Sequence, residues 1–337
     1  MKCLLVAAFL GLASISPPWA QAAEKTPPAF VDAPAVREFI AEMRDRHGFD
    51  AERLARQFAA IRANPRVLQA IRPAPEQQRS WQRYRARFLN ERRLAHGLLF
   101  RREHGAALAR AEAIYNVPPE IIVAIIGVET EYGRNMGRFN VFEALATLAF
   151  DYPPRAEYFR RELEQFLLMA RENDTPPLAY KGSYAGAIGI PQFMPNSQRH
   201  HAVDFDGDGR ADLIGSFADA IGSVAHFLHV HGWRPGQPVA LPASVAGDAG
   251  ALVALGIKPS LSLREMTDRG VLPLADTVRL ADEPVALIDL PSPGQPTEYW
   301  LGFDNFHVIT RYNRSSFYAM SVFLLAEALR EAWERER

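Results

Sequence analysis

The chain has 337 residues, of which 48% are hydrophobic and 23% charged, and its formal net charge is -1. This composition is typical of a soluble globular protein with two or three subdomains, and the balanced charge argues against nucleic acid or another polyanion as partner. The single cysteine, Cys3, lies in the first stretch of the chain, which excludes a cysteine nucleophile and a disulfide framework from everything downstream.

The first residues have the pattern of a secretory signal peptide. Lys2 supplies a positive start, residues 3–14 an apolar core too short to span a bilayer, and Ala20-Gln21-Ala22 a small-x-small cleavage site. We therefore expect the mature chain to begin at Ala23 and to be periplasmic, because an exported protein without cysteine suits that compartment. Cys3 lies too close to the start to become lipid-modified after cleavage, so lipoprotein anchoring is disfavoured.

The next part of the chain is mostly helical. Between residues 36 and 102, apolar side chains recur at spacings of three and four, with a break at the prolines of residues 72–75, and a further helix is expected at 104–115. Aromatic residues follow the same spacing at Trp81, Tyr84 and Phe88, beside arginines. We expect Trp81 and Phe88 in the core, whereas the hydroxyl group of Tyr84 suits a partly wet wall.

The stretch from Val117 to Gly133 organises the rest of the chain. Two prolines suit the first turn of a helix, and residues 121–128 carry no polar side chain, which predicts a helix buried on all sides. Glu129 closes this apolar run, and Gly133 marks the stop. A carboxylate in that place is costly unless it is paired or its pKa is raised for a purpose, so Glu129 is a candidate functional acid. The alternative is that Glu129 simply emerges into solvent.

Two further helices are expected at residues 140–150 and 155–172, joined by a turn at Tyr152-Pro153-Pro154, and Arg155 opens the second. Residues 181–195 then combine three glycines and two prolines with small and aromatic residues. This composition predicts a loop-helix element that lines a cleft, with Ser183, Gln192 and Phe193 as its chemically useful side chains. Tight structural packing is the alternative interpretation.

Residues 204–212 match the first part of an EF-hand loop. Carboxylates occupy positions 1, 3, 5 and 9 and a glycine position 6, but Gly215 replaces the glutamate of position 12, and Asp219 is the natural substitute. We expect a cation with a structural role, because three closely spaced aspartates would otherwise repel one another. The histidine clusters at 200–201 and 226–231 match no zinc pattern, so we interpret them as solvated or capping residues.

The last third of the chain changes character. A helix is expected at residues 219–231, followed at 235–293 by a partly β segment with short apolar runs at 278–280 and 285–290. Residues 299–303 and 306–310 have the pattern of strands or extended pieces, and an amphipathic helix at 315–336 ends the chain. The sequence contains no HExxH, Walker, GxSxG or GxGxxG motif.

Five stretches together resemble the lytic transglycosylase B family of peptidoglycan-cleaving enzymes: 117–133, 152–169, 181–195, 204–233 and 299–320. The most specific motifs are Gly127-Val-Glu-Thr-x-Tyr/Trp-Gly133 and Gln192-Phe-Met-Pro195. The resemblance implies an α+β, mainly α fold, with a lysozyme-like catalytic core, a helical N-terminal domain and a small β-rich segment. His307 departs from the family pattern, where a tyrosine is frequent, which leaves one wall contact of the cleft open.

The resemblance also implies the roles of individual residues. Glu129 falls on the family's catalytic acid, whereas Glu131 lies at a position that varies. The implied substrate-binding residues are Tyr84, Arg155, Ser183, Gln192, Phe193, Tyr312 and Asn313. The implied calcium ligands are Asp204, Asp206, Asp208, Arg210 through its carbonyl group, and Asp219.

The organisation that we expect has five segments. A signal peptide at 1–22 precedes a leader and helical domain at 23–110, the lysozyme-like core with the EF-hand-like loop at 111–233, a small partly β segment at 234–298, and a cleft strand or loop with the C-terminal helix at 299–337. We expect a monomer that acts on peptidoglycan glycan strands, with no catalytic cofactor and with a structural Ca2+. Cell-wall synthesis or hydrolysis proteins remain open as further partners.

The expected reaction is cleavage of the MurNAc–GlcNAc β-1,4 bond without water, giving 1,6-anhydro-MurNAc ends. One glutamate would act as acid and then as base, with assistance from the acetamido group of the substrate. Two alternatives stay open: a hydrolytic muramidase on the same fold, and a peptidoglycan-binding protein without catalytic activity. The complete motif around Glu129 argues against the second.

Overall fold

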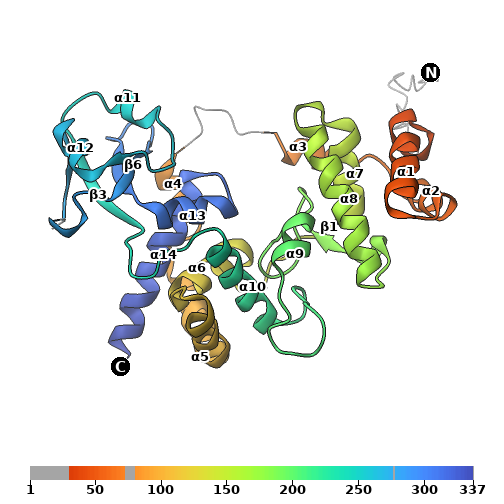
Figure 1. The fold of residues 1–337 in the computed structure, drawn as a ribbon, viewed down its shortest axis with the longest axis horizontal. Coiled ribbons are helices and arrows are strands. Elements are labelled where there is room, and N and C mark those ends of the chain that lie inside the picture. Colours follow the sequence, from red (N-terminus) through yellow and green to blue (C-terminus); the bar gives the residue numbers. More distant parts are fainter. Residues whose placement is uncertain (1–29, 73–79, 276–277, 337) are drawn as a thin grey trace, which may run out of the picture.

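The computed structural model describes residues 30–72, 80–275 and 278–336, so the predicted signal peptide and the prolines of the break at 72–75 lie outside the described residues. The described part of the fold is mainly helical, as predicted, with a five-stranded sheet and a short two-stranded one (Figure 1). The helices are α1 (Pro34–His47), α2 (Ala51–Ala59), α3 (Pro65–Ala70), α4 (Trp81–Ala86), α5 (Glu91–Tyr115), α6 (Pro119–Thr130), α7 (Val141–Asp151), α8 (Ala156–Glu172), α9 (Pro195–His201), α10 (Phe217–Val230), α11 (Ala249–Val253), α12 (Leu263–Asp268), α13 (Asp304–Tyr312) and α14 (Ser316–Arg335). The strands are β1 (Phe139–Asn140), β2 (Lys181–Gly182), β3 (Ala240–Val245), β4 (Leu261–Ser262), β5 (Val271–Pro273), β6 (Pro284–Leu290) and β7 (Glu298–Gly302).

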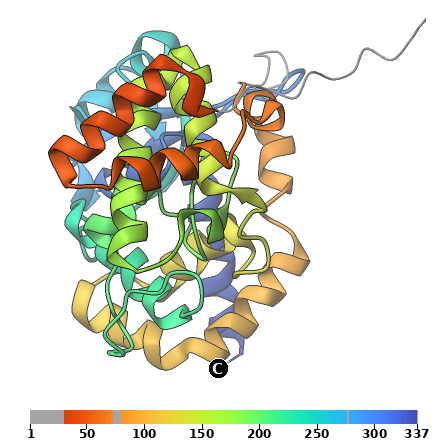
Figure 2. The same ribbon diagram turned by 90° about the vertical axis from the view of Figure 1, so that its right-hand side faces the viewer.

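Among the residues that the structure describes, the buried side chains form three apolar clusters. The N-terminal cluster packs α1, α2 and α3 against α7 and α8, and Figure 2 shows α1 and α2 in red to orange in front of α7 and α8. The central cluster surrounds α6 with side chains of α5, α10 and α14, and the sheet cluster lies between the strands and α11 and α12. The clusters do not follow the predicted segments. Helices α7 and α8 lie within the predicted core segment at 111–233, but they pack with the N-terminal helices.

The larger sheet has five antiparallel strands in the order β4-β6-β7-β3-β5. Its long middle pairing joins Ile288 of β6 to Trp300 of β7. Strand β7 leads directly into α13, and the N–H group of Phe303 at this junction donates a 3.0 Å hydrogen bond to the carbonyl oxygen of Val239. The sheet therefore anchors the start of α13, the helix that carries Tyr312.

Helix α6 is the buried element that the sequence predicts. Pro119 stands at its first position, where a missing N–H group costs nothing, and residues 121–128 are all buried. Neighbours α5, α10 and α14 cover it on several sides. Its C-terminal end, with Glu129, is therefore placed by packing against three other helices.

The structure corrects three predicted elements. Residues 306–310 are not a strand but part of α13, because Phe306, Ile309 and Thr310 reach the core at helical spacing. Residues 278–280 form a short 3-10 helix, η5, outside the sheet. The helix expected at 104–115 is the second half of α5, which begins at Glu91 and is kinked at His104.

Within the described residues, no single helix is long and apolar enough to span a membrane; α5 and α6 meet the length and composition criteria only as a pair bent by 116°.

Candidate active site

The end of α6 is tied to the glycine-rich loop at residues 181–195. The hydroxyl group of Thr130, the last residue of α6, donates to the carbonyl oxygen of Ile190 at 2.7 Å and accepts from the N–H group of Gly133 at 2.9 Å. Gly189 has a left-handed φ of 77°, and a Cβ atom there would lie 2.3 Å from the carbonyl oxygen of Leu213. This close approach explains why the loop needs glycine beside the end of α6.

Glu129 lies one residue before the end of α6, with its side chain in a mostly apolar environment. Burial raises the pKa of Glu129 to about 7, and a hydrogen bond from the hydroxyl group of Tyr318 partly opposes this shift. That hydrogen bond reaches Oε1 of Glu129 at 2.6 Å. The residue as a whole is only partly buried.

Tyrosine rings lie beside this carboxyl group. Tyr312 and Tyr318 are stacked, with ring centroids 6.3 Å apart and planes at 14°. Burial, together with the charge of Glu129, raises the pKa of both hydroxyl groups well above the usual value and that of Tyr84 to about 12. All three hydroxyl groups therefore stay protonated beside Glu129 at neutral pH.

Phe193 extends the aromatic wall. Its ring centroid lies 5.6 Å from that of Tyr312, whose hydroxyl group donates to the carbonyl oxygen of Pro191. Tyr84 packs against Phe317 at 5.6 Å, on α14. Three of the residues predicted from the sequence thus belong to the aromatic group near Glu129: Tyr84, Phe193 and Tyr312.

Ser183 and Gln192 are used by the loop itself. The hydroxyl oxygen of Ser183 accepts hydrogen bonds from the N–H groups of Ala185 and Ala187. The side-chain amide of Gln192 donates to the carbonyl oxygens of Met136 at 3.1 Å and Gly189 at 2.9 Å, and its backbone has a left-handed φ of 51°. Both side chains shape the loop.

Arg155 and Asn313, the two remaining predicted substrate contacts, do not lie in this aromatic group. The guanidinium group of Arg155 lies 4.5 Å from the ring centroid of Tyr158 and 5.1 Å from that of Phe159, where α8 begins. Asn313 is exposed and caps the C-terminal end of α13.

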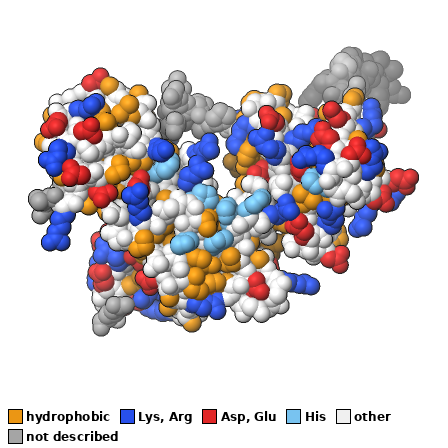
Figure 3. Space-filling model, viewed as in Figure 1, with side chains coloured by type: hydrophobic (Ala, Val, Ile, Leu, Met, Phe, Trp, Pro, Cys, Tyr) orange, Lys and Arg blue, Asp and Glu red, His pale blue; other side chains and the backbone are white. Residues whose placement is uncertain are grey.

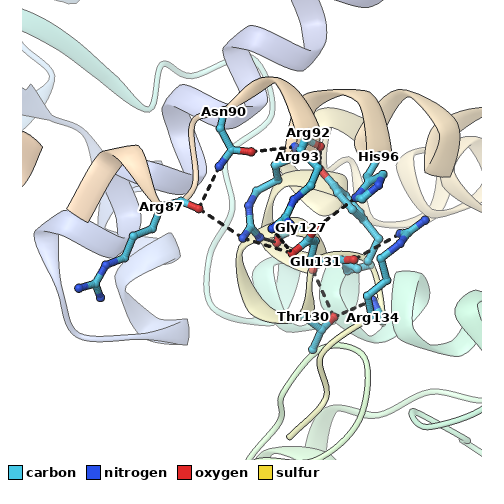
Figure 4. Close-up of polar contacts among 12 residues, drawn as sticks. Arg87, Asn90, Arg92, Arg93, His96, Gly127, Thr130, Glu131 and Arg134 are labelled. Carbon is cyan, nitrogen blue, oxygen red and sulfur yellow. Dashed lines mark hydrogen bonds and ion pairs between the residues drawn. The ribbon is translucent and has the colours of Figure 1, made fainter. Parts of the chain in front are cut away.

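Glu131 faces away from this site, toward α5. Its carboxylate pairs with Arg92 at 3.0 Å and His96 at 3.2 Å (Figure 4). These partners show that Glu131 is ion-paired on the α5 side.

The EF-hand-like loop and the start of α10 bring carboxylate oxygens together. One carboxylate oxygen from each of Asp204, Asp206 and Asp219 lies within 4.8 Å of the others. Asp208 instead accepts a 2.8 Å hydrogen bond from the N–H group of Arg210. Three acidic oxygens at this separation suit a cation that prefers oxygen ligands, and Asp219 takes the place predicted for it.

The predicted histidine clusters come together on one face of the molecule, over α9 and α10 (Figure 3). Nδ1 of His226 lies 2.9 Å from the carbonyl oxygen of His201, and Nδ1 of His231 lies 2.7 Å from that of Phe227. Burial and the neighbouring imidazoles lower the pKa of His201 to about 4, so it is neutral. Within the described chain, the histidines form no group of three ligand atoms close enough to share a metal ion.

Sequence reasoning missed Tyr318, the hydrogen-bond donor to Glu129. It lies 189 positions further along the chain, in the first turn of α14. An apolar helix face that includes a tyrosine was the sole available signal, and that pattern also fits an ordinary core residue.

Comparison with known proteins identifies the family. Residues 32–327 match the family model described as the transglycosylase SLT domain. Over 309 residues the chain is 41% identical to the membrane-bound lytic murein transglycosylase B of Escherichia coli (strain K12), covering 89% of this chain and 84% of that protein. This chain belongs to the lytic transglycosylase family. The predicted peptidoglycan lytic transglycosylase, which is a lyase, is thereby confirmed.

Solved structures of lytic transglycosylases have the same fold. The soluble lytic transglycosylase SltB1 from Pseudomonas aeruginosa is 46% identical, with a TM-score of 0.82 over 89% of this chain and 100% of that one. The Escherichia coli lytic transglycosylase SLT35 in complex with calcium is 40% identical, with a TM-score of 0.79 over 91% and 96%. SltB3 from Pseudomonas aeruginosa in complex with NAG-anhNAM-pentapeptide is 34% identical, with a TM-score of 0.75 over 88% and 79%. The predicted lysozyme-like, mainly α fold is confirmed.

Proposed function

We propose that this lytic transglycosylase cleaves the MurNAc–GlcNAc β-1,4 bond of peptidoglycan with Glu129 as its single acid and base, leaving 1,6-anhydro-MurNAc ends. The observation that carries the proposal is the place of Glu129 near the end of the buried helix α6, hydrogen-bonded by Tyr318, where burial raises its pKa to about 7. A carboxyl group with that pKa can give up a proton and take one back near neutral pH.

The surroundings of Glu129 support a route with one carboxylate. Most glycosidases use two carboxyl groups, one as acid and one as base or nucleophile. Here Glu131 is paired with α5, and no carboxylate among the described residues acts on the pKa of Glu129. A substrate-assisted reaction needs no second carboxyl group, because the acetamido group of the sugar takes over the role of the nucleophile.

The reaction runs in two steps. Protonated Glu129 donates its proton to the glycosidic oxygen, the bond from that oxygen to C1 of MurNAc breaks, and the acetamido oxygen stabilises the positive charge at C1. The carboxylate of Glu129 then takes the proton of the C6 hydroxyl group, while O6 forms a bond to C1 and displaces the acetamido oxygen. Glu129 ends in its protonated form, and no water is consumed.

The other predicted residues serve as glycan contacts in this proposal. Tyr84, Phe193 and Tyr312 would form walls for the sugar rings, since aromatic faces suit the apolar side of a saccharide. Ser183 and Gln192 would present the loop, whose backbone they hold, to the acetamido group and the glycan. Arg155 and Asn313 complete the proposed set.

The complex of SltB3 with NAG-anhNAM-pentapeptide supports an anhydro product for a relative of this chain. For this protein the test is mass spectrometry of the muropeptides that it releases from purified sacculi. We expect products lighter by one water than those of a hydrolytic muramidase digest of the same sacculi. Products with reducing ends would overturn the anhydro mechanism, and a lack of released products would overturn the catalytic role altogether.

Tyr318→Phe is expected to move the alkaline limb of the pH profile of kcat/KM. The first step needs protonated Glu129, so activity falls as the pH rises through about 7. The Tyr318 hydrogen bond favours the carboxylate, and its loss raises the pKa of Glu129 and shifts the limb to higher pH by roughly 1 pH unit. The matched control is Tyr312→Phe. The hydroxyl group of Tyr312 donates to the carbonyl oxygen of Pro191 and not to Glu129, so the alkaline limb of this variant should stay in place.

We propose that the acidic loop holds a structural calcium ion through Asp204, Asp206 and Asp219, with Asp208 and the carbonyl group of Arg210 as further ligands. The gathered oxygens and the calcium complex of SLT35 support this assignment. At a calcium concentration about 100 times the Kd, the bound ion stabilises the folded state by about 2.7 kcal/mol, so chelation should lower the Tm by several degrees. Thermal unfolding with calcium and with chelator measures this, and an unchanged Tm, or the same change in an Asp204→Asn variant, would contradict the site.

We propose a periplasmic location for the protein. The name of the curated relative, a membrane-bound murein transglycosylase, supports a place in the cell envelope. The signal peptide and the monomeric state stay predictions.

A further inference from the structure

Two residues with left-handed backbone follow the helix that carries Glu129. The φ angle is 52° at Glu131 and 62° at Tyr132, a conformation that residues other than glycine rarely adopt. Such geometry persists where neighbouring contacts impose it, and it gathers at functional sites. Here the contacts come from the first turns of α5 (Figure 4).

Tyr132 fills a slot between α5 and α6. A Cβ atom on Gly97 of α5 would lie 2.5 Å from its hydroxyl oxygen, and one on Gly127 of α6 would lie 2.6 Å from the same atom. The hydroxyl group donates to the carbonyl oxygen of Arg93 at 3.1 Å. The two helices can approach each other, with the ring between them, because both positions lack a side chain.

Arg93 also links α5 to α6. Its guanidinium group is buried, donates from Nη1 to the carbonyl oxygen of Gly127, and lies 4.0 Å from the carboxylate of Glu131. Gly127 stands two positions before Glu129, in the last turn of α6, where the helix dipole favours a cation. Arg93, Glu131 and Tyr132 thus form a clamp that holds the end of α6 on α5.

Stability alone does not explain a buried arginine here. Burial lowers the pKa of Arg93, because removing a guanidinium charge from water is costly. Its Nε atom is also buried without a hydrogen-bond partner. An apolar side chain of similar length would avoid both penalties, so the arginine needs another reason to be there.

We propose that Arg93 is a positioning residue for Glu129, an inference that rests on the proposed catalytic role of Glu129. The clamp fixes the backbone on both sides of Glu129, and Thr130 fixes it to the glycine-rich loop. With that backbone held, the carboxylate stays 2.6 Å from the hydroxyl group of Tyr318. The influence of Arg93 is geometric, since the pKa of Glu129 depends on burial and on Tyr318.

The test compares the kinetics of Arg93→Met with those of the wild-type protein. The variant keeps a long side chain but loses the hydrogen bond to Gly127. We expect kcat to fall at least about tenfold with KM within about twofold, because a small displacement of a catalytic group is enough for such a loss. The alkaline limb should move to higher pH, as in Tyr318→Phe, and combining both variants should add no further shift. Arg93→Lys, which keeps the charge, should recover part of kcat.

Arg92→Met is the matched control. Arg92 also pairs with Glu131, but its side chain is 70% exposed, so we expect kcat within about twofold of wild type. If Arg93→Met does not fold, Glu131→Gln tests the same clamp, with a smaller loss of kcat and the same shift of the limb. A folded Arg93→Met protein, or failing that a Glu131→Gln protein, with wild-type kcat and an unmoved limb would overturn the inference. Activity retained in Glu129→Gln would instead overturn the proposed function.

Discussion

Glu129→Gln is expected to lower kcat for muropeptide release by at least about 10³-fold, because general acid–base catalysis contributes about 10²–10⁴-fold and one group serves both steps. Glutamine has nearly the same shape and can still accept the hydrogen bond from Tyr318. Binding should therefore persist while turnover stops. The measurements are release of soluble fragments from sacculi and co-sedimentation of the protein with them.

The matched control for this variant is Glu120→Gln. Glu120 belongs to the same helix, and burial also raises its pKa, but it lies about 13.5 Å away along the axis at nine residues of 1.5 Å each. We expect nearly wild-type kcat in the control. Comparable losses in both variants would show that removing any buried charge from α6 disturbs the enzyme, and the assignment of Glu129 would then lose its support.

Asp219→Ala is expected to reduce the free energy of unfolding by about 3–5 kcal/mol. The side chain is fully buried and accepts hydrogen bonds from the N–H groups of Phe205, Asp206 and Asp212, at 2.7, 3.2 and 2.8 Å. Alanine would leave three backbone donors without a partner, each at a cost of about 1–3 kcal/mol. Urea denaturation in the presence of a chelator measures the effect without any contribution from calcium.

Asp208→Ala provides the comparison in the same loop. Asp208 is exposed and accepts its hydrogen bond from Arg210 in the open turn, where water can replace it. We expect a change of about 0.5 kcal/mol under the same chelating conditions. Equal destabilisation by the two variants would mean that Asp219 does not organise the loop.

Local patterns were enough to predict the parts of the site that lie within one segment. The apolar run at 121–128, with Pro119 before it and Glu129 at its end, predicted a buried helix with a perturbed carboxyl group, and the structure has both. The spacing of the aspartates in 204–212 similarly predicted a turn of clustered carboxylates. In both cases a short range of residues carries all the information, because helical periodicity and tight-turn geometry act over a few positions.

Local patterns were misleading where packing decides between helix and strand. Residues 306–310 contain β-branched side chains and were predicted to be extended, but their burial against the core at helical spacing makes them part of α13. Ser183 and Gln192 have polar groups that can hydrogen-bond either to a ligand or to the protein backbone, and the sequence alone does not distinguish the two. The fold directs them to backbone atoms of the loop and of Met136.

By itself, the sequence determined the family motifs, the buried helix that carries Glu129 near its end and the acidic loop, since each depends on neighbours along the chain. The tertiary structure alone decided that Tyr318 donates to Glu129 and that Arg93 donates to Gly127, across 189 and 34 positions. These partners come from other helices, and their meeting depends on how α5 and α14 pack around α6. Helix packing sums many weak contacts over whole surfaces, so no short pattern in the chain encodes which two side chains will touch.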